Sequence, residues 1–105
     1  MTLEELQTLI RDRYYATDSA RGTPGTFMHF MEEVGELSTA LYDNNRPPEP
    51  DGSARPPTPV ERANLEEEFA DVLAWLATLA NINGVSLTEV MHKYTEPGRV
   101  EGTKA

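Results

Sequence analysis

The sequence predicts an all-α protein, specifically an antiparallel helical bundle completed by dimerisation. Apolar residues recur at helical spacing in two long stretches, Ser/Thr-x-x-Glu capping boxes mark three helix starts, and no alternating strand pattern of useful length is present. The 105 residues make one domain, 1–105. A domain of this size buries only around two thirds of its unfolded surface, so a second copy would help to cover its long apolar helices.

The first two predicted helices lie before the proline-rich part of the chain. A capping box at Thr2–Glu5 opens the first, which we expect to end near Tyr15, because the following "TDSARGTPG" consists of turn formers. The second starts near residues 24–26 and ends at residues 43–45. Its apolar stripe is Phe27, Phe30, Met31, Val34, Leu37 and Leu41.

A proline-rich loop is predicted at about residues 44–59. It contains six of the eight prolines, and such density excludes regular structure, so we expect a mobile or polyproline-like connection. Connections of this length are uncommon in compact domains. A functional loop and a neutral insertion both remain open.

The third predicted helix has a strong start signal, since Thr58, Pro59 and Glu61 supply a cap, a proline at the first position and the capping-box acid. It should run to Gly84. Its expected core stripe is Leu65, Phe69, Val72, Leu73, Leu76, Leu79 and Ala80. A box at Ser86–Glu89 then opens a short helix that ends at Pro97-Gly98, and a loose tail is predicted from about residue 97.

The charge balance limits the possible partners. The net charge is −9, from 18 acidic and 9 basic residues, and no basic cluster is present, which argues against nucleic acid and anionic membranes. An acidic protein can still bind a polyanion through divalent cations. The absence of cysteine excludes disulfides and thiolate zinc sites, and no apolar leader or membrane span is evident, so we expect a cytoplasmic protein.

Four acids fall beside the apolar stripes when the helices are drawn at about 100° per residue. With Phe30 as the reference, Glu33 and Glu36 lie about 60° and 120° to one side, while Glu32 points nearly away. With Phe69 as the reference, Glu68 and Asp71 lie about 100° and 160° to one side.

Antiparallel packing of the two helices can bring these flanks together. Four converging carboxylates would repel one another unless protons or a cation compensate, and Mg²⁺ prefers hard oxygen ligands. The alternative, an ordinary solvated acidic face, remains open at this point.

The stretches "EEVGE" (32–36) and "EFAD" (68–71) resemble the E-E-x-x-E … E-x-x-D signature of MazG-like nucleotide pyrophosphohydrolases. The likeness extends over "EEVGELSTAL", "EEEFADVLAWLATLANINGVSLTEVMHKY" and the weaker "GTPGTFMHFM". Two departures are the motif separation, residues 37–67, which is slightly longer than usual, and a thin basic tail.

This resemblance implies a homodimeric or homotetrameric helical protein that hydrolyses a nucleoside triphosphate to a monophosphate and pyrophosphate, with a possible role in nucleotide-pool house-cleaning. It implies Mg²⁺, with Mn²⁺ as a substitute, held by Glu33, Glu36, Glu68 and Asp71. Water activation would fall to Glu32 or Glu36 as catalytic residues.

Further polar and aromatic residues are candidates for substrate binding. They are His29, Asn64, Trp75, Lys93 and Arg99, and for each a purely structural or surface role remains open. Two alternative functions also remain: a phosphoribosyl-ATP pyrophosphohydrolase, which shares the metal motif, and a non-catalytic helical dimerisation module.

Overall fold

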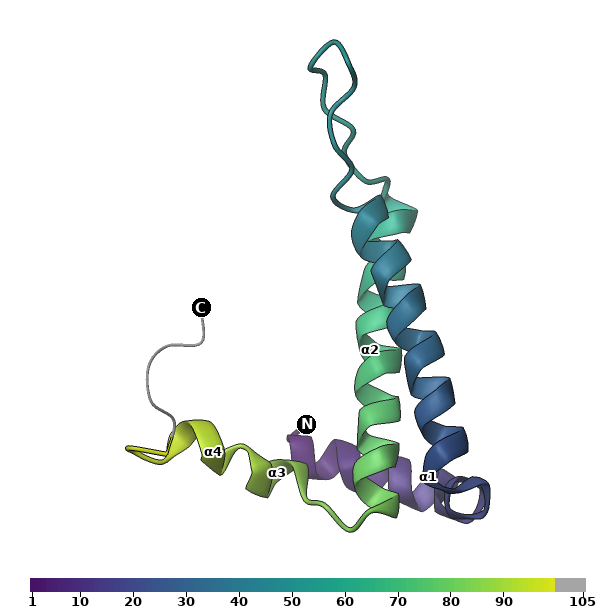
Figure 1. Ribbon diagram of the computed structural model, residues 1–105, viewed down its shortest axis with the longest axis vertical. Helices are drawn as coiled ribbons and strands as arrows, with labels where there is room; N and C mark the ends of the chain where they lie inside the picture. Colours follow the sequence, from purple (N-terminus) through teal and green to yellow (C-terminus); the bar gives the residue numbers. More distant parts are fainter. Residues whose placement is uncertain (100–105) are drawn as a thin grey trace.

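The computed structural model describes residues 1–99, and within them every regular element is a helix. The elements are α1 (Leu3–Asp43), α2 (Pro59–Ile82), α3 (Leu87–Val90) and α4 (His92–Thr95) (Figure 1). The predicted all-α class is therefore confirmed.

α1 consists of two helical segments that meet at Gly22, whose φ of 80° and ψ of 174° are non-helical. The prediction that the first helix ends near Tyr15 is wrong, because the helix continues to Arg21. Turn-forming side chains find partners inside the helix: the Ser19 hydroxyl donates to the Tyr15 carbonyl (2.7 Å), and Arg21 pairs with Asp18 (3.1 Å). Only glycine adopts the positive φ at residue 22 readily, so the chain turns there.

The second segment of α1 (23–43) lies alongside α2, and the chain runs in opposite directions along the two (Figure 1). The connecting loop projects beyond the end of this helix pair (Figure 1). Its base is fixed by Arg46, which pairs with Glu61 and Asp43, and its arms are joined by an ion pair between Glu49 and Arg55 (3.3 Å).

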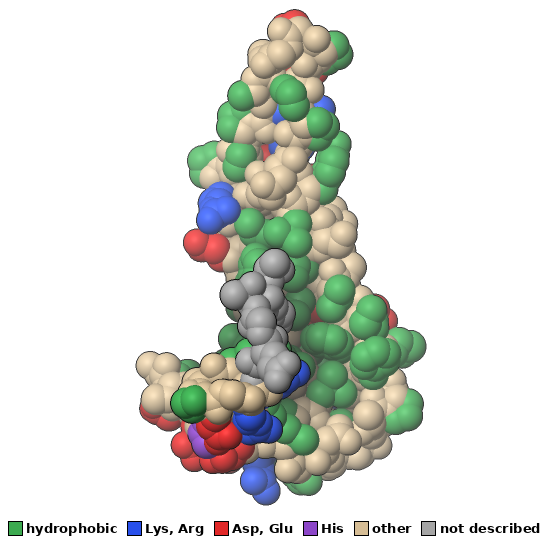
Figure 2. Space-filling view, turned by 60° about the vertical axis from the view of Figure 1, so that its left-hand side comes forward, with side chains coloured by type: hydrophobic (Ala, Val, Ile, Leu, Met, Phe, Trp, Pro, Cys, Tyr) green, Lys and Arg blue, Asp and Glu red, His purple; other side chains and the backbone are tan. Residues whose placement is uncertain are grey.

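The predicted apolar stripes are only partly buried. The buried apolar side chains are mostly small, namely Ala40, Leu65, Ala77, Ala80 and Leu87. By contrast, Phe27, Met31, Leu41, Phe69, Leu73 and Leu76 are between 39% and 54% exposed. The expectation that these larger residues form the core is therefore wrong for the single chain, because two packed helices present only one narrow contact face to each other. Figure 2 shows apolar side chains at the surface of the helix pair.

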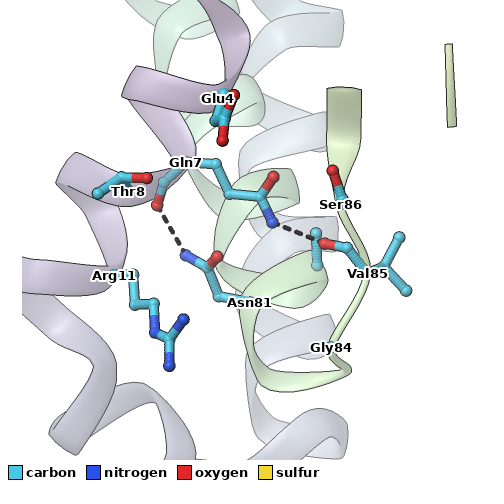
Figure 3. Close-up of a pocket in the computed structure, with 9 residues that line it drawn as sticks. Glu4, Gln7, Thr8, Arg11, Asn81, Gly84, Val85 and Ser86 are labelled. Atoms are coloured by element: carbon cyan, nitrogen blue, oxygen red, sulfur yellow. Dashed lines mark hydrogen bonds between the residues drawn. The ribbon is translucent and has the colours of Figure 1, made fainter. Parts of the chain in front are cut away.

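Gln7 holds the turn after α2 against the first segment of α1 (Figure 3). Its side-chain amide donates to the Val85 carbonyl (2.6 Å), while its carbonyl oxygen accepts from the Leu87 amide (2.9 Å). The Asn81 side chain donates to the Gln7 main-chain carbonyl (3.1 Å). These contacts fix the exit direction of the chain from α2.

The single short helix predicted after Ser86 is divided in the structure into α3 and α4, which meet at Met91. The Ser86 hydroxyl accepts from the Glu89 amide (3.2 Å), which is one of the two hydrogen bonds of the predicted capping box. Most of the predicted tail lies outside the described residues. Within residues 1–99 no single helix could cross a membrane, although α2 and the α3–α4 segment, which are bent by 104° relative to each other, together have the length and composition.

Candidate metal centre

Three carboxylates from two helices meet between the second segment of α1 and α2. Glu33 and Glu36 come from α1 and Glu68 from α2, and one oxygen of each lies within 4.8 Å of the others. Spacing of three residues places Glu33 and Glu36 on one side of α1, and antiparallel packing brings Glu68 opposite them. Glu33 and Glu68 are half-buried and Glu36 is exposed, so the group lies at the edge of the contact between the helices.

Two of these carboxylates are buried at the atomic level. Glu33 Oε2 and Glu68 Oε2 are shielded from solvent, and neither has a hydrogen-bond partner within the described chain. Burial raises the pKa of both Glu33 and Glu68, and the nearby charge of Glu36 raises both pKa values further. Burying an anionic oxygen without a donor costs free energy, and among residues 1–99 no ion pair to Glu33 or Glu68 offsets that cost.

The donor set fits a hard divalent cation. Three carboxylates from two helices supply oxygen ligands of the kind Mg²⁺ and Mn²⁺ prefer, and the unpartnered Glu33 and Glu68 oxygens are available for such an ion. Asp71 is exposed and outside the group of three carboxylates. Its charge nevertheless raises the pKa of Glu33 and of Glu68, so Asp71 is close enough to interact electrostatically with both.

Glu32 lies apart from the three grouped carboxylates. Its side chain is 62% exposed, and Glu32 Oε2 is 3.7 Å from His29 Nδ1, one helical turn earlier. The sequence had placed it on the far side of the helix, and the structure agrees with that direction.

His29 and Trp75 lie against each other one turn from the acids. The two rings are stacked at 5.2 Å with an interplanar angle of 24°. The Arg21 guanidinium lies 5.1 Å from the centroid of the Trp75 ring. These contacts give both aromatic side chains a packing role within the chain.

The other predicted substrate residues are not brought to the acids by this chain. Asn64 is exposed on α2, one turn before Glu68. Lys93 lies on α4 with its ammonium over the Tyr94 ring (5.4 Å), and Arg99 pairs with Glu96 (3.5 Å). Figure 1 shows α4 projecting away from the helix pair.

A buried polar group that was not predicted from the sequence lies at the end of the first α1 segment. Asp18 is 5% and Thr26 is 0% exposed, and Arg21 joins them, donating to Asp18 Oδ1 (3.1 Å) and to Thr26 Oγ1 (3.2 Å). The available signal was the helical spacing of Asp18 and Arg21, which the surrounding turn formers obscured.

Comparison with known proteins agrees with the acidic motifs. The model of the MazG nucleotide pyrophosphohydrolase domain matches residues 23–97. The uncharacterized protein YvdC of Bacillus subtilis (strain 168) is 39% identical over 70 residues, which are 63% of this chain and 62% of YvdC. The match thus spans less than two thirds of that relative. No solved structure matches the chain. The extent of the domain match shows that the chain belongs to the MazG nucleotide pyrophosphohydrolase family.

Proposed function

We propose that this protein is a Mg²⁺-dependent hydrolase that converts nucleoside or deoxynucleoside triphosphates to monophosphates and pyrophosphate. The observation that carries the proposal is the group of Glu33, Glu36 and Glu68, two of which have buried oxygens without a donor. Family membership supports the reaction class, and MazG proteins generally depend on a divalent metal. Removal of surplus or non-standard deoxynucleotides is the role we propose for this activity.

The charge of the protein makes a cation necessary for such a substrate. A chain with a net charge of −9 repels a triphosphate, and the carboxylate group is the most concentrated negative charge between α1 and α2. Glu33, Glu36 and Glu68 would hold the metal, with Asp71 as the fourth ligand. When bound, the cation supplies positive charge to the phosphate oxygens.

The remaining chemistry falls to side chains of this chain. A carboxylate accepts a proton from the attacking water molecule while the oxygen of that water bonds to the α-phosphorus. The α–β phosphoanhydride bond breaks at the same time, and pyrophosphate is released. Glu36 and Glu32 are the candidates for this base. Glu36 belongs to the carboxylate group of Glu33, Glu36 and Glu68, where the phosphates would bind. Glu32 could approach that group only if its contact with His29 were broken.

We further propose that the active form is a homodimer or a pair of dimers. The exposed stripe on α1 and α2, which includes Phe27, Met31, Phe69 and Leu73, provides an apolar surface suited to a second copy of the chain. In such an assembly Lys93 and Arg99 would be available to a neighbouring subunit's substrate.

Pyrophosphate release tests the proposed reaction. The purified protein is mixed with each ribo- and deoxynucleoside triphosphate, canonical and oxidised, in the presence of Mg²⁺. We expect release with at least one of them, and a loss of at least about 100-fold in kcat for Glu36→Gln, as for removal of a catalytic carboxylate. The matched control is Glu66→Gln, an exposed acid on α2, which should retain wild-type turnover.

Two results would overturn the proposal. One is the absence of pyrophosphate with every nucleotide, and the other is wild-type turnover by Glu36→Gln. Measuring Glu32→Gln in the same assay identifies the general base. A loss of kcat at unchanged metal affinity would assign that role to Glu32, and a retained kcat would assign it to Glu36.

A further inference from the structure

A separate cavity of about 320 Å³ lies between the first segment of α1 and α2. Its size is at the lower end for small-molecule sites, where apolar walls enclose a few polar groups. The residues that line it are Ile10, Tyr14, Thr17, Asp18, Arg21, Ala74, Trp75 and Thr78.

The cavity continues the line of the acidic group along α2. At about 100° per residue, Ala74, Trp75 and Thr78 all point within about 60° of the direction of Asp71. At about 1.5 Å per residue they follow Asp71 by roughly 4 to 10 Å. A molecule whose phosphates lie at Glu68 and Asp71 can therefore extend along this face into the cavity.

The polar groups of the cavity are fixed in place. Asp18 and Thr78 are each 5% exposed, and Arg21 is held between Asp18 and the fully buried Thr26. The Arg21 guanidinium donates to Oδ1 of Asp18, and an ionised carboxylate has further acceptor positions. The cavity thus presents a hydrogen-bond acceptor and a guanidinium donor side by side, between the apolar side chains of Ile10 and Ala74 and the Trp75 ring.

The α1 side of the cavity lies in the part of the chain that precedes the domain match. The MazG domain match begins at residue 23, whereas Ile10, Tyr14, Thr17, Asp18 and Arg21 all precede it. The α2 side lies within the match. The first segment of α1 therefore forms a wall of the cavity from outside the matched range.

We propose that this cavity binds the nucleobase of the substrate and that Asp18 selects bases with an exocyclic amine. This inference rests on the proposed function. The Asp18 carboxylate accepts from the amino group of cytosine, adenine or guanine, and Arg21 donates to an adjacent ring nitrogen or carbonyl. Uracil and thymine present carbonyl oxygens at that position, which the carboxylate repels.

Nucleoside binding without metal tests the cavity independently of catalysis. Trp75 is the chain's one tryptophan, so its fluorescence reports on this cavity. In EDTA we expect deoxycytidine or deoxyadenosine to change Trp75 emission at lower concentration than thymidine. Asp18→Asn should weaken the amino nucleosides by about tenfold or more, the usual effect of losing a hydrogen bond to a charged group, and leave thymidine unchanged or tighter. Asp12→Asn, an exposed acid on the same helix, is the matched control.

A second variant tests the cavity in case Asp18→Asn fails to fold. Ala74→Leu fills the cavity from α2 without removing a polar group, and it should weaken all nucleosides alike. Glu36→Gln should lose turnover yet keep nucleoside binding, so the two proposals can fail separately. Equal binding of amino and non-amino nucleosides, or no emission change in the wild type, overturns the base-binding proposal.

Discussion

Glu33 and Glu68 each have one carboxylate oxygen that the fold buries, and neither has an ion-pair partner within residues 1–99. Burial raises their pKa values above the ordinary 4.5, so the ionised forms weaken the folded state. The sign follows directly: this destabilisation is absent at pH values below about 4.5 and grows as the pH rises through the raised pKa. Once the pH lies above the raised pKa values, the metal-free protein carries the full penalty.

Glu68→Gln should remove that penalty. At pH 7 in EDTA we expect the variant to unfold at a higher temperature than the wild type, because the amide is neutral. Mg²⁺ should raise the Tm of the wild type and have little effect on the variant, since stabilisation requires binding. Circular dichroism melts measure both, with Glu66→Gln as control. A wild-type Tm that Mg²⁺ does not change would contradict the metal centre.

The start of α2 is an element whose local signals and tertiary contacts agree. Thr58 and Glu61 form the complete capping box, with the Glu61 amide donating to Thr58 Oγ1 (3.1 Å) and the Thr58 amide donating to Glu61 Oε1 (2.9 Å). The Glu61 carboxylate also accepts hydrogen bonds from Arg46 of the proline-rich loop. The contact with Arg46, together with the hydrogen bond from the Thr58 amide, lowers the pKa of Glu61 to about 2. One side chain therefore caps α2 and attaches the loop.

Glu61→Gln isolates the charged part of this interaction, because glutamine can still complete the capping box. The folded pKa of about 2 lies below the ordinary 4.5, so the stabilisation is present above about pH 4.5 and is lost as the pH falls towards 2. We expect the variant to have a lower Tm than the wild type at pH 7, and a much smaller Tm difference at pH 2, where about half of Glu61 is protonated in the folded state. A Tm difference that does not change with pH would contradict this.

At the scale of the whole molecule, the chain has more apolar surface than it can cover. Phe69 is 54% exposed and Phe27 is 52% exposed, although both occupy stripe positions of long helices. The chain's extents of 52 × 39 × 27 Å reflect the helix pair, the projecting loop and the outlying α3–α4 segment (Figure 1). Such a shape leaves helix faces open for a further layer.

Phe69→Asp should therefore prevent assembly. We expect the wild type to sediment as a dimer or tetramer and the variant as a monomer, because a charge at the centre of an apolar interface is left desolvated. Val60→Asp is the matched control, since Val60 is 79% exposed but lies off the stripe in the first turn of α2. Analytical ultracentrifugation decides, and a monomeric wild type would contradict the proposed assembly.

Local sequence signals predicted the elements well where capping and breaking residues were strong. Thr2 and Thr58 start the two long helices as expected, and α1 ends at Asp43 as the Asp-Asn-Asn run indicates. The segment 16–21 was mispredicted because helix propensity is a weak preference, and the Asp18–Arg21–Thr26 contacts override it. Nothing in the local pattern announces those partners.

The sequence by itself determined the helical class, the family motifs and which acids share a helix side. Periodicity and capping depend on neighbours a few residues apart, so one chain suffices to show them. Only the tertiary structure decided that Glu33, Glu36 and Glu68 meet at the edge of the helix contact, that Phe27 and Phe69 lie outside it, and that the first α1 segment encloses a cavity against Trp75. Those outcomes depend on the rotation of each helix about its axis and on the turn at Gly22, which are fixed by packing between distant residues.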